Sequence, residues 1–246
     1  MKRRGSASKP ARTQETDKFV YNQAQWSLLK AFRDRAITVF EGLGGWRESS
    51  IIHGSVARGD VDEKSDIDIV IPTETATQLV ETGLENSGFT IFAREISQAT
   101  PAHSPKAHLY LDPEQQIVVT VPLVQFRGLE AEFYRFGGAA TLQDLRTSLR
   151  VSGCTKRLTL IEPMMDGHLE SPVVEHEMEV ARKVGVSVDI VRERVRVLTR
   201  RDRLGRTGTF LKLKVPEAVT FEEVLDEEIK TNPALRRTLR ARKMSG

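Results

Sequence analysis

The chain has 246 residues, of which 39% are hydrophobic and 29% charged, and its formal net charge at pH 7 is only +3. This length and apolar content allow one large domain or two small ones with a buried core. No run approaches the roughly eighteen apolar residues of a membrane span, and the single cysteine, Cys154, excludes an intrachain disulfide, so we expect a soluble cytoplasmic protein with no membrane partner.

Charge is unevenly distributed along the chain. Residues 1–17 are rich in Lys and Arg and otherwise polar, with Gly, Ser and Pro, and this composition predicts a disordered basic tail. A nucleic-acid-binding arm is the alternative interpretation of the same stretch.

The next unit, assigned to residues 18–170, mixes predicted helices and strands. Apolar residues recur at helical spacing from Phe19 to Leu43 and stop at a group of glycines, which predicts one long amphipathic helix. The other predicted helices are Thr75–Gly83, Leu129–Phe136 and Leu142–Leu149, and the predicted strands are Ser50–Ile52, Ile67–Ile71, Phe89–Ile96, Ala107–Leu111, Gln115–Val124 and Arg157–Ile161. Turn-forming residues at Pro163, Gly167 and Pro172 mark the end of this unit.

The last unit, residues 171–246, has a different pattern. Two helices, Glu175–Val184 and Val188–Leu204, flank a short turn in which Ser187 is the expected N-cap of the second helix. A Gly-rich turn then leads into Thr209–Val215, where Leu and Val alternate with Lys. A helix, a turn, a second helix and a hairpin predict a winged helix, and the chain should close with a further helix and a basic tail.

Positive charge is concentrated on this unit. Between Arg192 and Lys214 there are nine Lys or Arg residues and two acids, and three arginines recur every fourth residue on one helix face. Such a surface suits the phosphate backbone of a nucleic acid, although solvated surface charge and a protein-docking module are the alternatives. The residues expected to bind nucleic acid are Arg192, Arg196, Arg200, Arg203, Arg206, Lys212 and Lys214.

The most informative stretch is HGSVARGDVDEKSDIDIVI, from His53 to Ile71. Alternation along a strand turns Asp66 and Asp68 to the same face, where two carboxylates repel each other unless a cation or solvent lies between them. Mg²⁺ is commonly bound by one or two carboxylates together with phosphate oxygens. The glycine of the Gly54-Ser55 pair allows close approach of the backbone to a phosphate, and the serine can donate a hydrogen bond to it.

This motif resembles the signature of the DNA polymerase β-like nucleotidyltransferase superfamily, and most closely that of its small archaeal and bacterial stand-alone members. The resemblance implies an α/β (α+β) fold with a small mixed sheet, a nucleoside triphosphate bound near Gly54, Ser55, Arg58 and Ser65, and Mg²⁺ or Mn²⁺ bound by the catalytic pair Asp66 and Asp68. The implied reaction transfers a nucleoside monophosphate to a hydroxyl and releases pyrophosphate.

One departure from the family pattern concerns a third carboxylate on a neighbouring strand. The corresponding strand here, QQIVVTVPLV, offers only Thr120, whose neutral hydroxyl is a poor Mg²⁺ ligand. Asp112 or Glu114, just before that strand, could supply the acid, while a turn role for the same residues is the alternative.

Two functions of different classes follow. The first is a nucleotidyltransferase that modifies a nucleic acid, such as an RNA or tRNA end, or a partner protein. The second is a nucleic-acid-binding regulator whose nucleotidyltransferase-like domain binds nucleotide without catalysis; a scaffold with neither activity is a third alternative.

Overall fold

The long N-terminal helix starts later than its apolar pattern predicts. In the computed structural model, which describes residues 15–205 and 208–243, helix α1 spans Gln23–Gly42, and the preceding strand β1 spans Asp17–Val20. Asn22 caps the helix: its side chain accepts a hydrogen bond from the Gln25 amide, and the Gln25 side chain accepts one from the Asn22 amide. This capping box makes the helix begin directly after Asn22, a position that hydrophobic periodicity alone does not mark. Phe19 and Val20 therefore precede the helix and lie in strand β1.

The described residues form a larger sheet of seven strands in the order β11-β4-β5-β6-β3-β2-β7. Its members are β2 (Ile51–His53), β3 (Ile67–Val70), β4 (Ala93–Gln98), β5 (Lys106–Tyr110), β6 (Ile117–Pro122), β7 (Ala139–Ala140) and β11 (Leu211–Lys214). Strands β3 and β6 are parallel and all other neighbours are antiparallel. The mixed sheet implied by the motif is therefore present.

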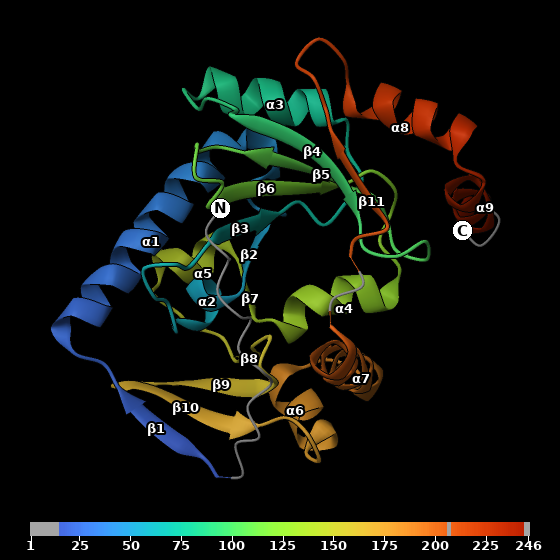
Figure 1. Cartoon of the computed structure of the whole chain (residues 1–246). Coiled ribbons are helices and arrows are strands. Elements are labelled where there is room, and N and C mark those ends of the chain that lie inside the picture. Colours follow the sequence, from blue (N-terminus) through green and yellow to red (C-terminus); the bar gives the residue numbers. More distant parts are fainter. Residues whose placement is uncertain (1–14, 206–207, 244–246) are drawn as a thin grey trace, which may run out of the picture.

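The two faces of this sheet have different chemistry. Helices α1 and α3 (Thr77–Asn86) cover one face, where side chains such as Ile67, Ile69 and Val119 are fully buried (Figure 1). Helix α4 (Gly128–Phe136) lies on the other side. Because side chains alternate along a strand, Asp68 points to the face opposite Ile67 and Ile69.

A second, smaller sheet lies below α4 in Figure 1 and has the order β1-β10-β9-β8 among the described strands. It consists of β1, β8 (Gly153–Cys154), β9 (Thr159–Met164) and β10 (Gly167–Pro172), all antiparallel. Together with α4, α6 (Glu177–Val184) and α7 (Val188–Leu204) it encloses a second apolar core. As predicted, Ser187 caps α7 by accepting a hydrogen bond from the amide of Ile190.

The predicted winged helix is not confirmed. Strand β11, which should have formed the wing, pairs with β4 at the edge of the larger sheet, with Leu213 opposite Ile96. Pairing satisfies the backbone groups that β4 would otherwise expose along its edge, and it buries Leu211 and Val215 in the main core. The predicted boundary between residues 170 and 171 also lies inside β10.

The C-terminal helices belong to the main core as well. Helix α8 (Phe221–Thr231) and helix α9 (Pro233–Lys243) contribute Phe221, Leu225, Leu235 and Leu239 to it. Short helices α2 (Ser55–Arg58), α5 (Leu142–Arg146) and the 3-10 turn η1 (Gly44–Trp46) complete the elements. The predicted tails fall largely on residues 1–14 and 244–246, outside the described residues, and no helix of the described chain is long and apolar enough to cross a membrane.

Candidate active site

Asp66 and Asp68 lie on the wall of a cavity of about 340 Å³ on the α4 side of the larger sheet. Asp68 belongs to β3 and pairs with His53 of β2, while Asp66 immediately precedes the strand. Strands β5 and β6 and helix α4 supply the remaining walls, including His108, Thr120 and Tyr134. The sequence-predicted carboxylate pair therefore opens into one concave space.

The two carboxylates are not neutralised by close partners. No hydrogen bond or ion pair joins either side chain to another residue in the ranges 15–205 and 208–243. Burial, together with the charge of Asp66, raises the pKa of Asp68 to about 6, and burial also raises the pKa of Asp66. The positive charge of the exposed Lys156, in the turn before β9, lowers the pKa of both carboxyl groups and so opposes both shifts.

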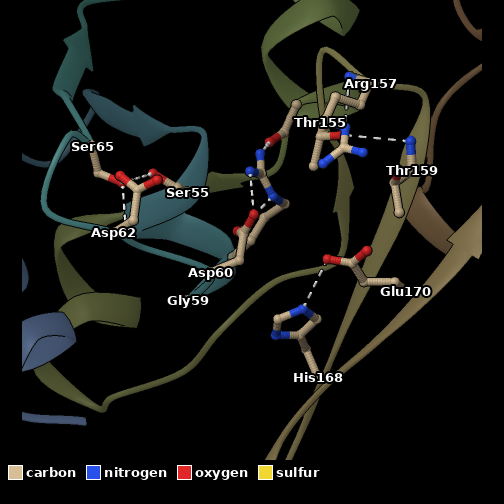
Figure 2. A network of polar contacts seen from close by, with 12 residues as sticks. Ser55, Gly59, Asp60, Asp62, Ser65, Thr155, Arg157, Thr159, His168 and Glu170 are labelled. Carbon is tan, nitrogen blue, oxygen red and sulfur yellow. Dashed lines mark hydrogen bonds and ion pairs between the residues drawn. The ribbon is translucent and has the colours of Figure 1, made fainter. Parts of the chain in front are cut away.

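The Gly-Ser half of the motif contacts the loop directly before Asp66, although Gly54, Ser55 and Ser65 are not among the residues that line the cavity. Gly54 ends β2 with φ +92°, a region that favours glycine, and its amide donates to the carbonyl of Gly138 at 2.9 Å. Ser55 starts α2, and its hydroxyl donates to the Ser65 hydroxyl at 3.1 Å, directly before Asp66 (Figure 2). The ten-residue separation in sequence thus becomes a direct contact in space.

Arg58 hydrogen-bonds to other parts of the protein instead of facing the cavity. Its side chain is buried and donates from Nε and Nη2 to the two carboxylate oxygens of Asp60, at 2.9 and 2.8 Å, and from Nη1 to the carbonyl of Gly137 at 2.5 Å. These contacts tie the end of α2 to the loop before β7. Arg58 is not among the residues that line the cavity, so the structure does not bring it together with Asp66 and Asp68.

A second buried arginine holds α2 from its other side. Arg33 of α1 donates to the carbonyl oxygens of Val56 at 3.1 Å and Ala57 at 3.0 Å, and burial lowers its pKa to about 10. These are the carbonyl groups that a helix of one turn leaves without internal partners. Sequence analysis missed this residue, because an arginine on a helix gives no sign of the chain segment that it will contact.

The predicted candidates for a third acid lie outside the cavity. The carboxylate of Asp112 accepts hydrogen bonds from the amides of Gln116 at 3.1 Å and Ile117 at 2.6 Å, so it stabilises the turn before β6. Glu114 is exposed in the same turn. On β6, Val118 pairs with Asp68 and Thr120 with Val70, and these two side chains occupy the cavity wall next to the aspartates.

A divalent cation nevertheless fits the donor set. Asp66 and Asp68 offer carboxylate oxygens to the same cavity, and the pKa of Asp68 is raised first by burial and then by the charge of Asp66, so a bound cation would stabilise its charged form. Within the described residues no group of three or more His, Cys, Asp or Glu side chains could hold a metal ion. The arrangement therefore suits a cation that completes its coordination with substrate phosphates rather than an all-protein site.

The cavity also contains polar residues that sequence analysis did not assign. Lys106 lies 4.9 to 5.8 Å from the ring centroids of Phe126, Phe133 and Tyr134, and its ammonium donates to the Tyr134 hydroxyl at 2.9 Å. Burial lowers the pKa of Lys106 to about 8. The alternation of β5 could have indicated this polar face in the sequence. Lys106, His108 and Tyr110 share one face of the strand, and Ala107 and Leu109 share the other.

The predicted nucleic-acid-binding residues fall on two elements. Arg192, Arg196, Arg200 and Arg203 are exposed on α7, Lys212 and Lys214 are exposed on β11, and Arg206 lies outside the described residues. Lys212 forms an ion pair with Glu95 at 3.1 Å. Helix α7 packs on α4, and its Arg194 guanidinium lies 5.0 Å from the ring centroid of Phe133, which lines the cavity. The basic helix is thus a neighbour of the carboxylate site.

A second cavity, of about 320 Å³, lies between the 59–62 loop and the smaller sheet. Tyr21, in the link between β1 and α1, donates to the carbonyl of Gly59 at 2.9 Å, and its hydroxyl lies 2.6 Å from Nδ1 of His168, so it joins this link to the loop and to β10. Figure 2 shows His168 and Glu170 facing this space across from Asp60. The loop that leads to Asp66 in the first cavity therefore forms a wall of the second.

Comparison with known proteins identifies part of the chain. No curated protein and no solved structure was found to match it. Residues 34–124 match the family model of the nucleotidyltransferase domain. This region includes the Gly54-Ser55 turn, both aspartates and the strands from β2 to β6. The match supports a place in the nucleotidyltransferase superfamily.

Proposed function

We propose that the protein is a metal-dependent nucleotidyltransferase that moves a nucleoside monophosphate from a nucleoside triphosphate to a hydroxyl group. The observation that carries the proposal is the unneutralised pair Asp66 and Asp68, which opens into the cavity beside the Gly54-Ser55 turn within the matched region. Two repelling carboxylates in one cavity without a cationic ligand cost stability, which favours a functional reason for their presence.

Each element of the site has a physical role in this reaction. Asp66 and Asp68 would hold Mg²⁺ or Mn²⁺, which supplies charge neutralisation for the triphosphate and lowers the pKa of an attacking hydroxyl. Gly54 keeps the turn free of a side chain, and the first turn of α2 presents backbone N–H groups for phosphate oxygens. Ser65 orients Ser55 through their hydrogen bond.

Lys156 extends the cationic side of the site. Its charge acts on Asp66 and Asp68, and its exposed side chain forms no ion pair with a carboxylate of the described residues. A lysine in this position can bind phosphate oxygens once a cation occupies the aspartates. We therefore add it to the residues that would contact the triphosphate.

For the acceptor, we favour a nucleic acid. The exposed arginines of α7 lie on the helix that packs against α4, and α4 forms a wall of the cavity, so a strand bound along α7 would be close to the carboxylate site. A partner protein is the alternative acceptor, and digestion of the labelled product with ribonuclease or protease separates the two.

The test is label transfer from α-³²P-labelled nucleoside triphosphates with Mg²⁺ or Mn²⁺ to total RNA and to a protein extract. Asp66→Asn and Asp68→Asn preserve side-chain shape and should abolish transfer, while the exposed Glu63→Gln removes one loop charge and should leave it unchanged. Equal labelling by the double asparagine variant and the unaltered protein would refute the assignment.

A second function, a nucleic-acid-binding regulator that binds nucleotide without catalysis, is favoured by one observation. Val118, an apolar residue, occupies the position of β6 that pairs with Asp68. This hypothesis predicts salt-sensitive binding of RNA or DNA that persists in the double asparagine variant and requires Arg192, Arg196 and Arg200. Absence of binding at low salt would exclude it.

A further inference from the structure

A continuous hydrogen-bonded row of side chains crosses the floor of the cavity from β6 to β4. The Nδ1 atom of His108 lies 3.0 Å from the hydroxyl of Thr120, and its Nε2 atom lies 2.7 Å from the hydroxyl of Ser97. All three residues line the same cavity as Asp66 and Asp68. The row therefore connects the carboxylate site to a nitrogen base two strands away.

The position of Thr120 connects this row of side chains to the aspartates. Thr120 pairs with Val70 on the parallel strand β3, so it is the diagonal neighbour of Asp68 on the same sheet face. Neither Asp112 nor Glu114 reaches the cavity, and Val118 has no polar atom to offer. Thr120 is thus the polar side chain of β6 that the fold places beside the aspartates.

We propose that Thr120 and His108 act together as the proton acceptor for the attacking hydroxyl, in the place where related enzymes use a third carboxylate; this inference rests on the proposed function. The acceptor oxygen forms its bond to the α-phosphorus while its proton passes to the Thr120 oxygen. The Thr120 proton passes in turn to Nδ1 of His108. The bond between the α-phosphorus and the pyrophosphate oxygen breaks, and its electron pair leaves with pyrophosphate.

The surroundings of His108 keep its imidazole uncharged and ready to accept a proton. Burial, Lys106 and Lys212 lower the pKa of His108 to about 4. Facing groups are Lys106 on its own strand, Lys212 on β11 and Glu95 on β4, the last two paired with each other. The lowered pKa keeps His108 neutral at pH 7, so one ring nitrogen remains free to accept a proton.

The required hydrogen-bond direction is specific. A neutral imidazole has one donor and one acceptor nitrogen. The relay needs Nδ1 as the acceptor from Thr120 and Nε2–H as the donor to Ser97. If the three side chains only satisfied one another in a buried place, the opposite tautomer would serve equally well.

Steady-state pyrophosphate release from each nucleoside triphosphate, with Mg²⁺ and total RNA, tests the catalytic part. Thr120→Val and His108→Gln should lower kcat about 100-fold or more, with KM for the triphosphate within about twofold, because they remove proton transfer and leave the phosphate site intact. Thr120→Ser should retain activity, and Thr120→Asp should restore it in the His108→Gln protein. Thr159→Val, the same exchange on a strand of the smaller sheet, is the control.

The outcomes separate this inference from the function on which it rests. If Asp66→Asn and Asp68→Asn abolish turnover while Thr120→Val and His108→Gln retain it, the relay is wrong and the nucleotidyltransferase assignment stands. If the asparagine variants remain active, the assignment itself fails. Independently of turnover, long-range ¹H–¹⁵N correlation spectra of the folded protein at pH 7 should show the Nε2–H tautomer of His108; the Nδ1–H tautomer would overturn the relay.

Discussion

The charge of Asp68 lowers the stability of the cation-free fold. Its pKa is raised from 3.8 to about 6 by burial and by Asp66, so the folded protein binds the proton more tightly than the unfolded chain does. The resulting penalty is absent below pH 3.8, grows as the pH rises, and is complete above pH 6. Without a cation, this carboxylate therefore destabilises the protein at neutral pH.

Replacing Asp68 with asparagine should stabilise the cation-free protein while abolishing transfer. We expect a gain on the order of 1–2 kcal/mol at pH 7.5, because the neutral amide has the same shape and lacks the buried charge. Urea unfolding with EDTA present, at pH 7.5 and at pH 4, measures it, and most of the gain should be lost at pH 4. Glu63→Gln provides the matched exposed control, and a loss of stability at pH 7.5 would contradict the argument.

At this scale, the sequence indicates contacts between residues that are close along the chain. Ser55 contacts Ser65, the residue before Asp66, within one strand-loop-strand segment, and alternation turns Asp66 and Asp68 to one cavity, while their roles in binding and catalysis stay predictions. Lys156 and His108 come from other segments: the fold brings His108 to the cavity and brings the charge of Lys156 close enough to act on both aspartates. The missing information was long-range contact, which a single sequence does not contain.

Among the elements, β11 shows how local pattern and tertiary pairing can diverge. Alternation correctly predicted a strand near Leu211–Lys214, yet its partner is β4, more than a hundred residues earlier, and not a neighbouring hairpin strand. The strands β2, β3, β5 and β6 were also predicted, because short apolar runs between turn signals identify buried strands. Strand β1 was missed, since its apolar residues continued the helical pattern of α1.

The edge position of β11 has a measurable energetic role. Leu211 is 6% exposed and belongs to the main core, whereas Leu204, at the end of α7, is 72% exposed. Leu211→Ala should lower the free energy of unfolding by about 2–4 kcal/mol, the usual cost of truncating a buried leucine. Leu204→Ala should change it by less than about 0.5 kcal/mol. Equal effects of the two changes in urea titrations would show that β11 is not part of the stable sheet.

For the whole molecule, the two cores are connected by segments that cross between them. The chain enters the smaller sheet at β1, builds most of the larger sheet, returns through β8 to β10, and then sends β11 and α8 back to the main core. Tyr21 and Arg150 link the N-terminal segment, the 59–62 loop and the smaller sheet by hydrogen bonds. Neither core is formed by one continuous stretch of sequence.

This interleaving predicts that the chain unfolds as a unit and cannot be divided at the boundary that its sequence suggested. A fragment ending at residue 170 would lack β11, expose the edge of β4 and leave part of the main core uncovered. It should therefore be largely unfolded or aggregated, while the full chain shows one cooperative transition. Circular dichroism melts and size-exclusion chromatography of both proteins test this. A fragment 1–170 that melts cooperatively near the temperature of the full chain would instead establish two independent domains, with β11 contributing little to the sheet that carries Asp66 and Asp68.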